Sequence, residues 1–165
     1  CAPPLRIQQE QESLWQHLLA GHIDLIASDH SPSPLFMKQS PGFFQVWGGI
    51  AGVQSMLPIM LVEGHLQRAL ALSEIAKLLS THVARRYKIA GKGRIAPGYD
   101  ADLVFVNPTT RRSLSESNLH YRHKISPYLG LPIDGLIRRT ILGGQTIYCD
   151  NAFFPHHGRL VKPSR

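Results

Sequence analysis

The chain has few cysteines and no long apolar run, and each absence removes a class of protein. Its 165 residues include only two cysteines, Cys1 and Cys149. Two cysteines do not make a disulfide framework, so we expect a reducing compartment, with the cytoplasm as that compartment if the source is bacterial. No apolar run approaches the roughly 20 residues of a membrane span, and no charged-then-apolar leader opens the sequence. We therefore expect no membrane partner.

Acidic residues are also scarce, since 11 Asp and Glu face 18 Lys and Arg, a net charge of +7. Such an excess raises the hypothesis of nucleic-acid binding. The basic residues, however, are dispersed in pairs such as Arg85-Arg86 and Arg138-Arg139, with no aromatic interleaving and no known reader motif. We interpret the charge as a solvated basic surface and expect no nucleic-acid partner.

The length allows one domain with a real core but not a complete eight-fold α/β barrel, which takes about 250 residues. The sequence begins at Cys1 without an initiator methionine. We therefore expect a fragment of a longer protein.

The first part of the chain predicts a helix, a turn and a buried strand in that order. An apolar stripe over residues 8–20 predicts the helix, and the apolar run 23–28 predicts the strand. Prolines at 32 and 34 end the strand, so Asp29 and His30 stand at its carboxyl end, where parallel α/β proteins place their chemistry. The alternative is that Asp29 caps a turn and His30 is a surface histidine. These residues alone leave both interpretations open.

Residues 31–49 form a long loop rich in Pro, Gly, Ser and aromatics, which is typical of a functional loop. Within it, Gly48 and Gly49 let the backbone approach a small ligand or simply begin the next helix. That helix is predicted over 50–63, bent at Pro58. Further helices are predicted to begin at caps Ser73 and Thr81, and Met56 and Met60 are expected to fill the core.

After residue 91 the pattern changes from helices to strands. Strands are predicted over 103–106, 137–142 and 145–149, the last two joined by Gly143-Gly144 in a tight hairpin. We therefore place a domain boundary near residue 91, giving domains 1–90 and 91–165. A basic cluster lies between the strand runs, and because it lacks carboxylates or cysteines at ligand spacing we interpret it as solvated surface. Its members are His120, Arg122, His123 and Lys124.

Six motifs occur in an order that resembles the carboxyl-terminal third of the cyclic amidohydrolases, and among them most closely the allantoinases. They are Cys-Ala-Pro-Pro-Leu-Arg at 1–6, Leu14-Trp15, Ser-Asp-His-Ser-Pro at 28–32, Trp-Gly-Gly-Ile-Ala-Gly at 47–52, Leu-Ser-Thr-His at 79–82, and Lys-Gly-Arg-Ile-Ala-Pro-Gly-Tyr-Asp-Ala-Asp-Leu-Val at 92–104. The resemblance implies an α/β fold in which residues 1–90 are the end of a TIM-like barrel and residues 91–165 belong to a small composite β-sandwich. It also implies that the parent protein is a homo-oligomer, a tetramer in that family.

The resemblance further implies a metal-dependent hydrolase that opens the ring amide of allantoin to give allantoate, in purine breakdown. Asp29 would ligate one metal of a binuclear zinc centre and move the proton of the attacking hydroxide to the leaving nitrogen. Cys1, Ser31, Trp47 and Gly48 would line or support the pocket of the small-molecule substrate.

Two alternatives stay open. Hydantoinases and dihydropyrimidinases resemble this chain but carry Cys-Ser-Pro-Pro and Asn-Gly where it has Ala2 and Gly48-Gly49. The parent could instead be a scaffold that has lost its metals. The histidine and lysine ligands of the family have no counterpart in this chain, so we expect the fragment alone to be inactive and to expose an apolar face.

Overall fold

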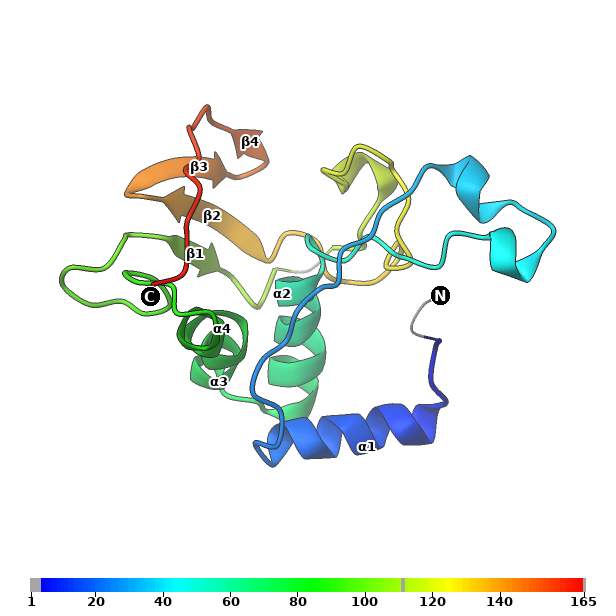
Figure 1. Cartoon of the computed structure of the whole chain (residues 1–165), viewed down its shortest axis with the longest axis horizontal. Coiled ribbons are helices and arrows are strands. Elements are labelled where there is room, and N and C mark those ends of the chain that lie inside the picture. The colour runs from blue at the N-terminus through cyan, green and yellow to red at the C-terminus, as the bar shows by residue number, and fades with distance from the viewer. Residues whose placement is uncertain (1–3, 111, 165) are drawn as a thin grey trace.

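The structure is a computed structural model that describes residues 4–110 and 112–164. It contains the helices α1 (Gln8–Leu19), α2 (Met56–Ile59), α3 (Leu72–Ala76) and α4 (His82–Arg86), followed by the strands β1 (Leu103–Val106), β2 (Ile137–Leu142), β3 (Gln145–Cys149) and β4 (Ala152–Phe153). In Figure 1, α1 lies at the bottom, the other helices lie above it, and the sheet lies at the upper left. The chain is therefore α/β with one small sheet, as the sequence predicts at this coarse level.

Helix α1 confirms the prediction made for residues 8–20. It ends at Leu19, and Gly21 follows with φ of +77°, a conformation that glycine adopts without strain. Leu18 is buried, but Leu14 and Leu19 keep 61% and 45% of their surface exposed. The rest of the chain thus covers only part of the apolar stripe of α1.

The second helix begins later than its apolar pattern predicts. Residues 50–55 are irregular, α2 begins at Met56, and the helix continues as a π-helical segment over Met60–Leu66. The start at residue 50 is wrong because the Ile50 carbonyl accepts a hydrogen bond from the Ser31 backbone, 2.9 Å away. Pro58 lies in the first turn, where its missing N–H has no helical partner to lose.

One continuous helix replaces the two that Ser73 and Thr81 predict. Helix α3, a π-helical segment over Lys77–Thr81 and α4 follow one another without a gap. Ala71 stands at the N-cap position, and Thr81 lies inside the helix with its hydroxyl donating to the Gly93 carbonyl at 2.5 Å. Both predicted caps are therefore wrong. Thr81 does not cap a helix because its hydroxyl is hydrogen-bonded to the loop that contains Gly93.

The sheet is antiparallel with the strand order β1-β2-β3-β4. The three predicted strands are confirmed, and Gly143 and Gly144 have φ of +56° and +83°, as a primed hairpin turn requires. Strand β4 was not predicted. It follows Asp150 and Asn151, which adopt positive φ and turn the chain back onto β3.

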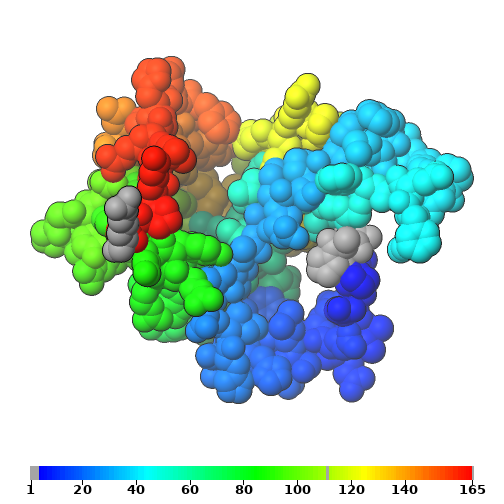
Figure 2. Space-filling model, in the orientation of Figure 1, coloured from blue at the N-terminus to red at the C-terminus, as the bar shows by residue number. Residues whose placement is uncertain are grey.

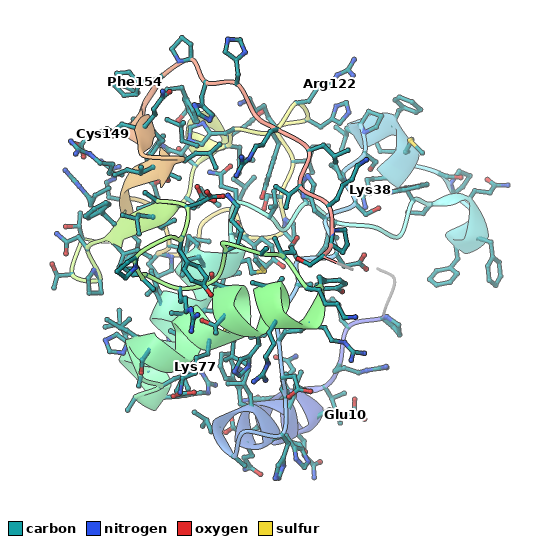
Figure 3. The ribbon with its side chains drawn as sticks, turned by 60° about the vertical axis from the view of Figure 1, so that its left-hand side comes forward. Glu10, Lys38, Lys77, Arg122, Cys149 and Phe154 are labelled. Carbon is teal, nitrogen blue, oxygen red and sulfur yellow. The ribbon has the colours of Figure 1, made fainter. Side chains whose placement is uncertain are left out.

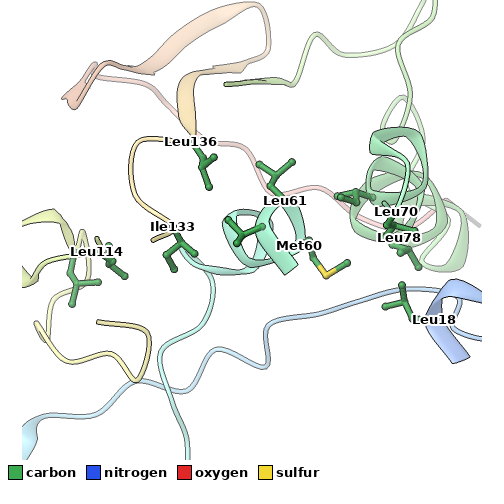
Figure 4. Packing of buried hydrophobic residues seen from close by; sticks show 11 residues of the cluster. Leu18, Met60, Leu61, Leu70, Leu78, Leu114, Ile133 and Leu136 are labelled. Carbon is green, nitrogen blue, oxygen red and sulfur yellow. The ribbon is translucent and has the colours of Figure 1, made fainter. Parts of the chain in front are cut away.

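A single apolar cluster holds the helices to the segment that precedes β2 (Figure 4). Leu61 of the π-helical segment and the later residues Leu119 and Leu136 are each at most 1% exposed. The cluster therefore joins side chains from both sides of residue 91. Its members are Leu18, Met60, Leu61, Val62, Leu70, Ile75, Leu78, Leu114, Leu119, Ile133 and Leu136.

Residues 23–28 do not form the predicted strand. In the part of the chain that the structure describes, no strand lies beside them, and the Ile26 N–H instead donates to the Leu78 carbonyl at 3.2 Å. An apolar run becomes a strand only when neighbouring backbone groups complete a ladder. The segment is also only half-buried, with Asp24 and Ala27 exposed.

The long loop 31–49 projects from one side of the molecule (Figures 1 and 2). It contains two short 3₁₀ helices, Leu35–Lys38 and Phe43–Gln45. Phe43 and Phe44 at its tip are 80% and 97% exposed. Across the described residues, no helix is long and apolar enough to cross a membrane.

Candidate functional site

Asp29 stands where the 23–28 segment turns into the long loop, and its side chain is exposed. Its backbone has φ of +42°, in the left-handed region that residues other than glycine rarely adopt. Such a conformation costs of order 1–3 kcal/mol and persists only where the surrounding structure holds it. The neighbouring segments therefore contribute to holding the backbone at Asp29.

The two ends of the long loop are in contact: residues 28–31 pack against residues 49–52. The Ser31 N–H donates to the Ile50 carbonyl at 2.9 Å. A Cβ added to Gly49 would lie 2.2 Å from the Ser31 Oγ and 2.7 Å from the Ser31 carbonyl oxygen, and one added to Gly52 would lie 3.0 Å from the Ser28 carbonyl oxygen. The approach of residues 28–31 to residues 49–52 thus requires glycine at position 49.

Lys38 and Trp47 fasten the base of this loop. The Trp47 indole Nε1 donates to the Ser31 carbonyl at 3.2 Å, and the Trp47 N–H donates to the Met37 carbonyl at 2.9 Å. The Lys38 ammonium donates to the Trp47 carbonyl at 2.8 Å and also to the Gly49 carbonyl. Lys38, labelled in Figure 3, was not singled out from the sequence, and no local pattern marks it.

The predicted pocket residues fall into two groups. Ser31 and Trp47 are in contact, and the half-buried Gly48 lies next to Trp47 in the same fastened loop. Cys1 lies outside the described residues. The structure therefore brings Trp47 to Ser31, which lies two residues after Asp29, and the role of Ser31, Trp47 and Gly48 in substrate binding stays a prediction.

His30 and a distant segment form contacts that sequence reasoning missed. The His30 Nδ1 accepts hydrogen bonds from the N–H groups of Gly52 at 3.1 Å and Val53 at 3.4 Å, and its ring lies 5.2 Å from the Tyr121 ring. The Tyr121 hydroxyl accepts the Gln54 N–H at 2.9 Å. His30 is exposed and its ring nitrogen is hydrogen-bonded to the loop backbone, so the alternative of a surface histidine with its hydrogen bonds made is confirmed for this residue.

Gln54 ties the same turn to residues 118–121. Its Nε2 donates to the Asn118 carbonyl at 2.8 Å, and its Oε1 accepts the His120 N–H at 2.9 Å. These contacts span more than 60 residues of sequence, so no spacing rule could have indicated them.

The basic cluster at 120–124 is exposed at His120, Arg122 and Lys124 and half-buried at His123, in agreement with the surface that the sequence predicts. The His120 ring also packs edge-on against Phe153 with centroids 4.7 Å apart. Partial burial, helped by the charge of Lys124, lowers the pKa of His120. The Lys124 ammonium donates to the Leu119 carbonyl.

A second ionic cluster lies away from Asp29 and connects the 91–102 loop to the sheet and the tail. Lys92 pairs with Asp100 at 2.9 Å and with Asp102, Arg159 pairs with Asp100 at 2.8 Å, and the Gly143 N–H donates to Asp102 at 2.8 Å. The hydrogen bonds that the Lys92 ammonium donates to Asp102 and Asp100 raise the pKa of Lys92, and the bond that Asp100 accepts from Lys92 lowers the pKa of Asp100. Burial opposes the change at Asp102, but the bonds from Lys92 and Gly143 still lower its pKa.

This chain alone does not fit a metal centre. Among residues 4–110 and 112–164, no three His, Cys, Asp or Glu side chains gather where they could hold a metal ion. A single exposed carboxylate such as Asp29 does not retain a catalytic metal against water. Two cavities of about 250 and 560 Å³ lie elsewhere, one next to Ser55 and Leu136 and the other next to Trp15 and Arg68, and Asp29 lines neither.

The sequence resembles allantoinases from several bacteria. It is 49% identical to the allantoinase of Rubrobacter xylanophilus over 100% of this chain and 37% of that protein. It is 47% identical to the allantoinase of Solibacter usitatus over 99% of this chain and 36% of that protein, and 44% identical to the allantoinase of Salmonella newport over 94% and 34%. The chain thus spans about a third of the length of these relatives.

Solved structures with the same arrangement are hydantoinases. The L-hydantoinase (dihydropyrimidinase) of Arthrobacter aurescens matches with a TM-score of 0.90 and 28% identity, over 98% of this chain and 37% of that one. The D-hydantoinase (dihydropyrimidinase) of a Thermus species matches with a TM-score of 0.88 and 28% identity, over 93% and 34%. The fold of this chain is therefore shared with these two hydantoinases.

A comparison with protein-family models gives a family assignment that agrees with these similarities to allantoinases and hydantoinases. The model named "Amidohydrolase family" matches residues 1–147, which include Asp29, the long loop and strands β1 and β2. The match covers far more than half of the sequence. The chain belongs to the amidohydrolase family.

Proposed function

We propose that this chain is the carboxyl-terminal part of an allantoinase, which adds water across the ring amide of allantoin to give allantoate. The observation that carries the proposal is the identity of 44–49% to allantoinases over at least 94% of the chain. The exposed Asp29, held in a left-handed turn beside a fastened loop, supplies the chemical group that the proposal needs.

The proposal includes the finer architecture. Residues 1–90 would be the last strand and flanking helices of a TIM-like barrel, and residues 91–165 would belong to a β-sandwich. In that setting the 23–28 segment gains the strand neighbours that it lacks here. The exposed side chains of Leu14, Leu19, Val104 and Phe105, each at least 45% exposed, gain apolar cover.

Asp29 would act as the acid-base group of the reaction. Its carboxylate takes a proton from the attacking water as the water oxygen bonds to the ring carbonyl carbon. It then delivers that proton to the ring nitrogen as the carbon–nitrogen bond breaks. The product carries a new carboxylate and an open-chain ureide, so one water is consumed and no other reactant is needed.

The proposal also gives Asp29 a second role as one ligand of a binuclear metal centre, with zinc as the metal. The remaining ligands would lie outside this chain, because the described residues offer no set of three.

Ser31, Trp47, Gly48 and Cys1 would line or support the substrate pocket. The fixed Ser31–Trp47 contact favours this for the indole, which would limit water access to the reacting ring. The full-length protein would be a homo-oligomer acting on a small molecule.

The test uses the full-length protein and the variant Asp29→Asn. We expect turnover of allantoin to be abolished with an unchanged melting temperature, because an amide keeps the shape of the side chain but neither takes nor delivers the proton. Asp24→Asn, an exposed aspartate on the same segment, is the matched control and should keep wild-type kcat. Residual Asp29→Asn activity within about tenfold of wild type would refute the role.

A hydantoinase or dihydropyrimidinase is the second candidate, favoured by the fold match to those structures at 28% identity. Allantoin, hydantoin and dihydrouracil should be assayed side by side with the full-length protein. Turnover of dihydrouracil with none of allantoin would reject the allantoinase assignment in favour of this candidate.

A further inference from the structure

Asp29 has φ of +42°, in the left-handed region that aspartate tolerates better than most residues other than glycine but that is still less favourable than extended backbone. The carboxylate can serve one reacting atom only if the backbone that carries it is fixed to well under 1 Å. Its neighbour in the chain, His30, offers the nearest fixed point.

His30 is fixed through a ring nitrogen that can only accept. Backbone N–H groups donate, so the Nδ1 that faces Gly52 and Val53 carries a lone pair. Two N–H groups converging on one nitrogen hold both the ring and the backbone that carries it. The same N–H groups would lose their partner if position 30 had an apolar side chain.

The turn that holds His30 is itself braced from the other half of the chain. Gln54 makes three hydrogen bonds to residues 118–121, at 2.9, 2.8 and 2.9 Å. Tyr121 takes part twice, since its hydroxyl accepts the Gln54 N–H and its ring lies against the His30 ring at 5.2 Å. Leu119, between these contacts, is fully buried and anchors the brace in the apolar core.

We propose that His30 is a positioning residue for the carboxylate of Asp29, and that Asn118–Tyr121 braces it through Gln54. His30 acts as a hydrogen-bond acceptor for the Gly52–Val53 turn and takes no part in the proton transfer. The inference rests on the proposed function, because it assigns His30 to the reaction carried out at Asp29.

The experiment compares three variants of the full-length enzyme by steady-state kinetics with allantoin and by thermal unfolding. His30→Leu removes the acceptor, His30→Asn puts an amide oxygen close to the place of Nδ1, and Tyr121→Phe removes only the hydroxyl. His157→Leu, at an exposed histidine of the tail, is the matched control and should keep wild-type kinetics.

We expect His30→Leu to lower kcat about 10- to 100-fold, the usual cost of losing a group that orients a reacting side chain. KM should change less than about twofold, because the substrate contacts stay in place. His30→Asn should recover most of kcat, and Tyr121→Phe should lower it about fivefold through the loss of one hydrogen bond.

Each other outcome has a distinct meaning. An active wild type with an unimpaired His30→Leu variant overturns the inference, and so does a His30→Asn variant as impaired as His30→Leu. If His30→Leu does not fold, His30→Asn and Tyr121→Phe decide, and a Tyr121→Phe enzyme with wild-type kcat overturns the brace. A folded wild type inactive on allantoin, hydantoin and dihydrouracil overturns the proposed function, and the inference fails with it.

Discussion

Replacing Gly49 by alanine should both destabilise the protein and impair the site, because the added methyl group has no room. An ideal Cβ there would lie 2.2 Å from the Ser31 Oγ, 2.4 Å from the Ser31 Cβ and 2.7 Å from the Ser31 carbonyl oxygen. Carbon atoms pack at about 3.5–4.0 Å, so residues 28–31 and 49–52 must separate by about 1 Å. Rotating the Ser31 hydroxyl relieves only the first of these contacts.

The magnitude follows from that displacement. Overpacking costs about 1–3 kcal/mol, and we expect the upper end because two of the three obstructing atoms do not move with a side-chain rotation. A shift of about 1 Å beside Asp29 should lower kcat/KM for allantoin about 100-fold.

Thermal unfolding and steady-state kinetics of the full-length protein measure both effects. Gly158→Ala is the matched control, since an added Cβ there meets nothing within 4 Å. Adding Ser31→Gly to Gly49→Ala removes two of the three obstructing atoms and should recover part of the lost melting temperature. A Gly49→Ala protein with wild-type stability and activity would refute the close packing of the two segments.

Two further changes test the indole and the ionic cluster. Trp47→Ala should raise KM for allantoin about tenfold, equal to about 1.4 kcal/mol of binding, or change the preference between allantoin enantiomers, and unchanged kinetics would leave Trp47 with packing alone. Lys92→Met should lower the free energy of unfolding by about 1 kcal/mol at neutral pH, whereas Lys162→Met, at an exposed lysine of the tail, should not change it. The pKa values of Asp100 and Asp102 lie below 3.8 in the folded protein and that of Lys92 above 10.5, so the stabilisation is complete between these values and declines as the carboxylates protonate below 3.8. An equal Lys92→Met deficit at about pH 3 and pH 7 would contradict this assignment.

The sequence predicts the elements whose hydrogen bonds are local. Helix α1 and the β2–β3 hairpin form as expected. The hydrogen bonds of a helix join residues four apart in the sequence, and the turn at Gly143-Gly144 sets the register of the two strands that it connects. Residues 23–28 and 50–55 depart from their patterns for the opposite reason. Ile26 and Ile50 instead bond to the backbone of the distant residues Leu78 and Ser31, which no local pattern indicates.

The same distinction applies to the candidate site. Asp29, Ser31 and Trp47 stand out in the sequence because prolines, glycines and an aromatic residue mark the loop that carries them. Lys38 and Gln54 do not stand out, because their role is to bind backbone groups that come near only in the folded chain. Composition and spacing therefore indicate which loop carries the candidate site residues, but not which side chains hold that loop in place.

The restraint on Asp29 has a consequence for how the two halves of the chain depend on each other. The turn at Gly52–Val53 bonds to His30 on one side, and Gln54 bonds to Asn118–Tyr121 on the other. Leu119 then connects that segment to the apolar cluster that also holds Leu61. A domain division near residue 91 would thus separate the proposed acid-base group from part of its support. In the proposed arrangement the residues after 91 contribute to the site by restricting the backbone at Asp29, although none of them is predicted to touch the substrate.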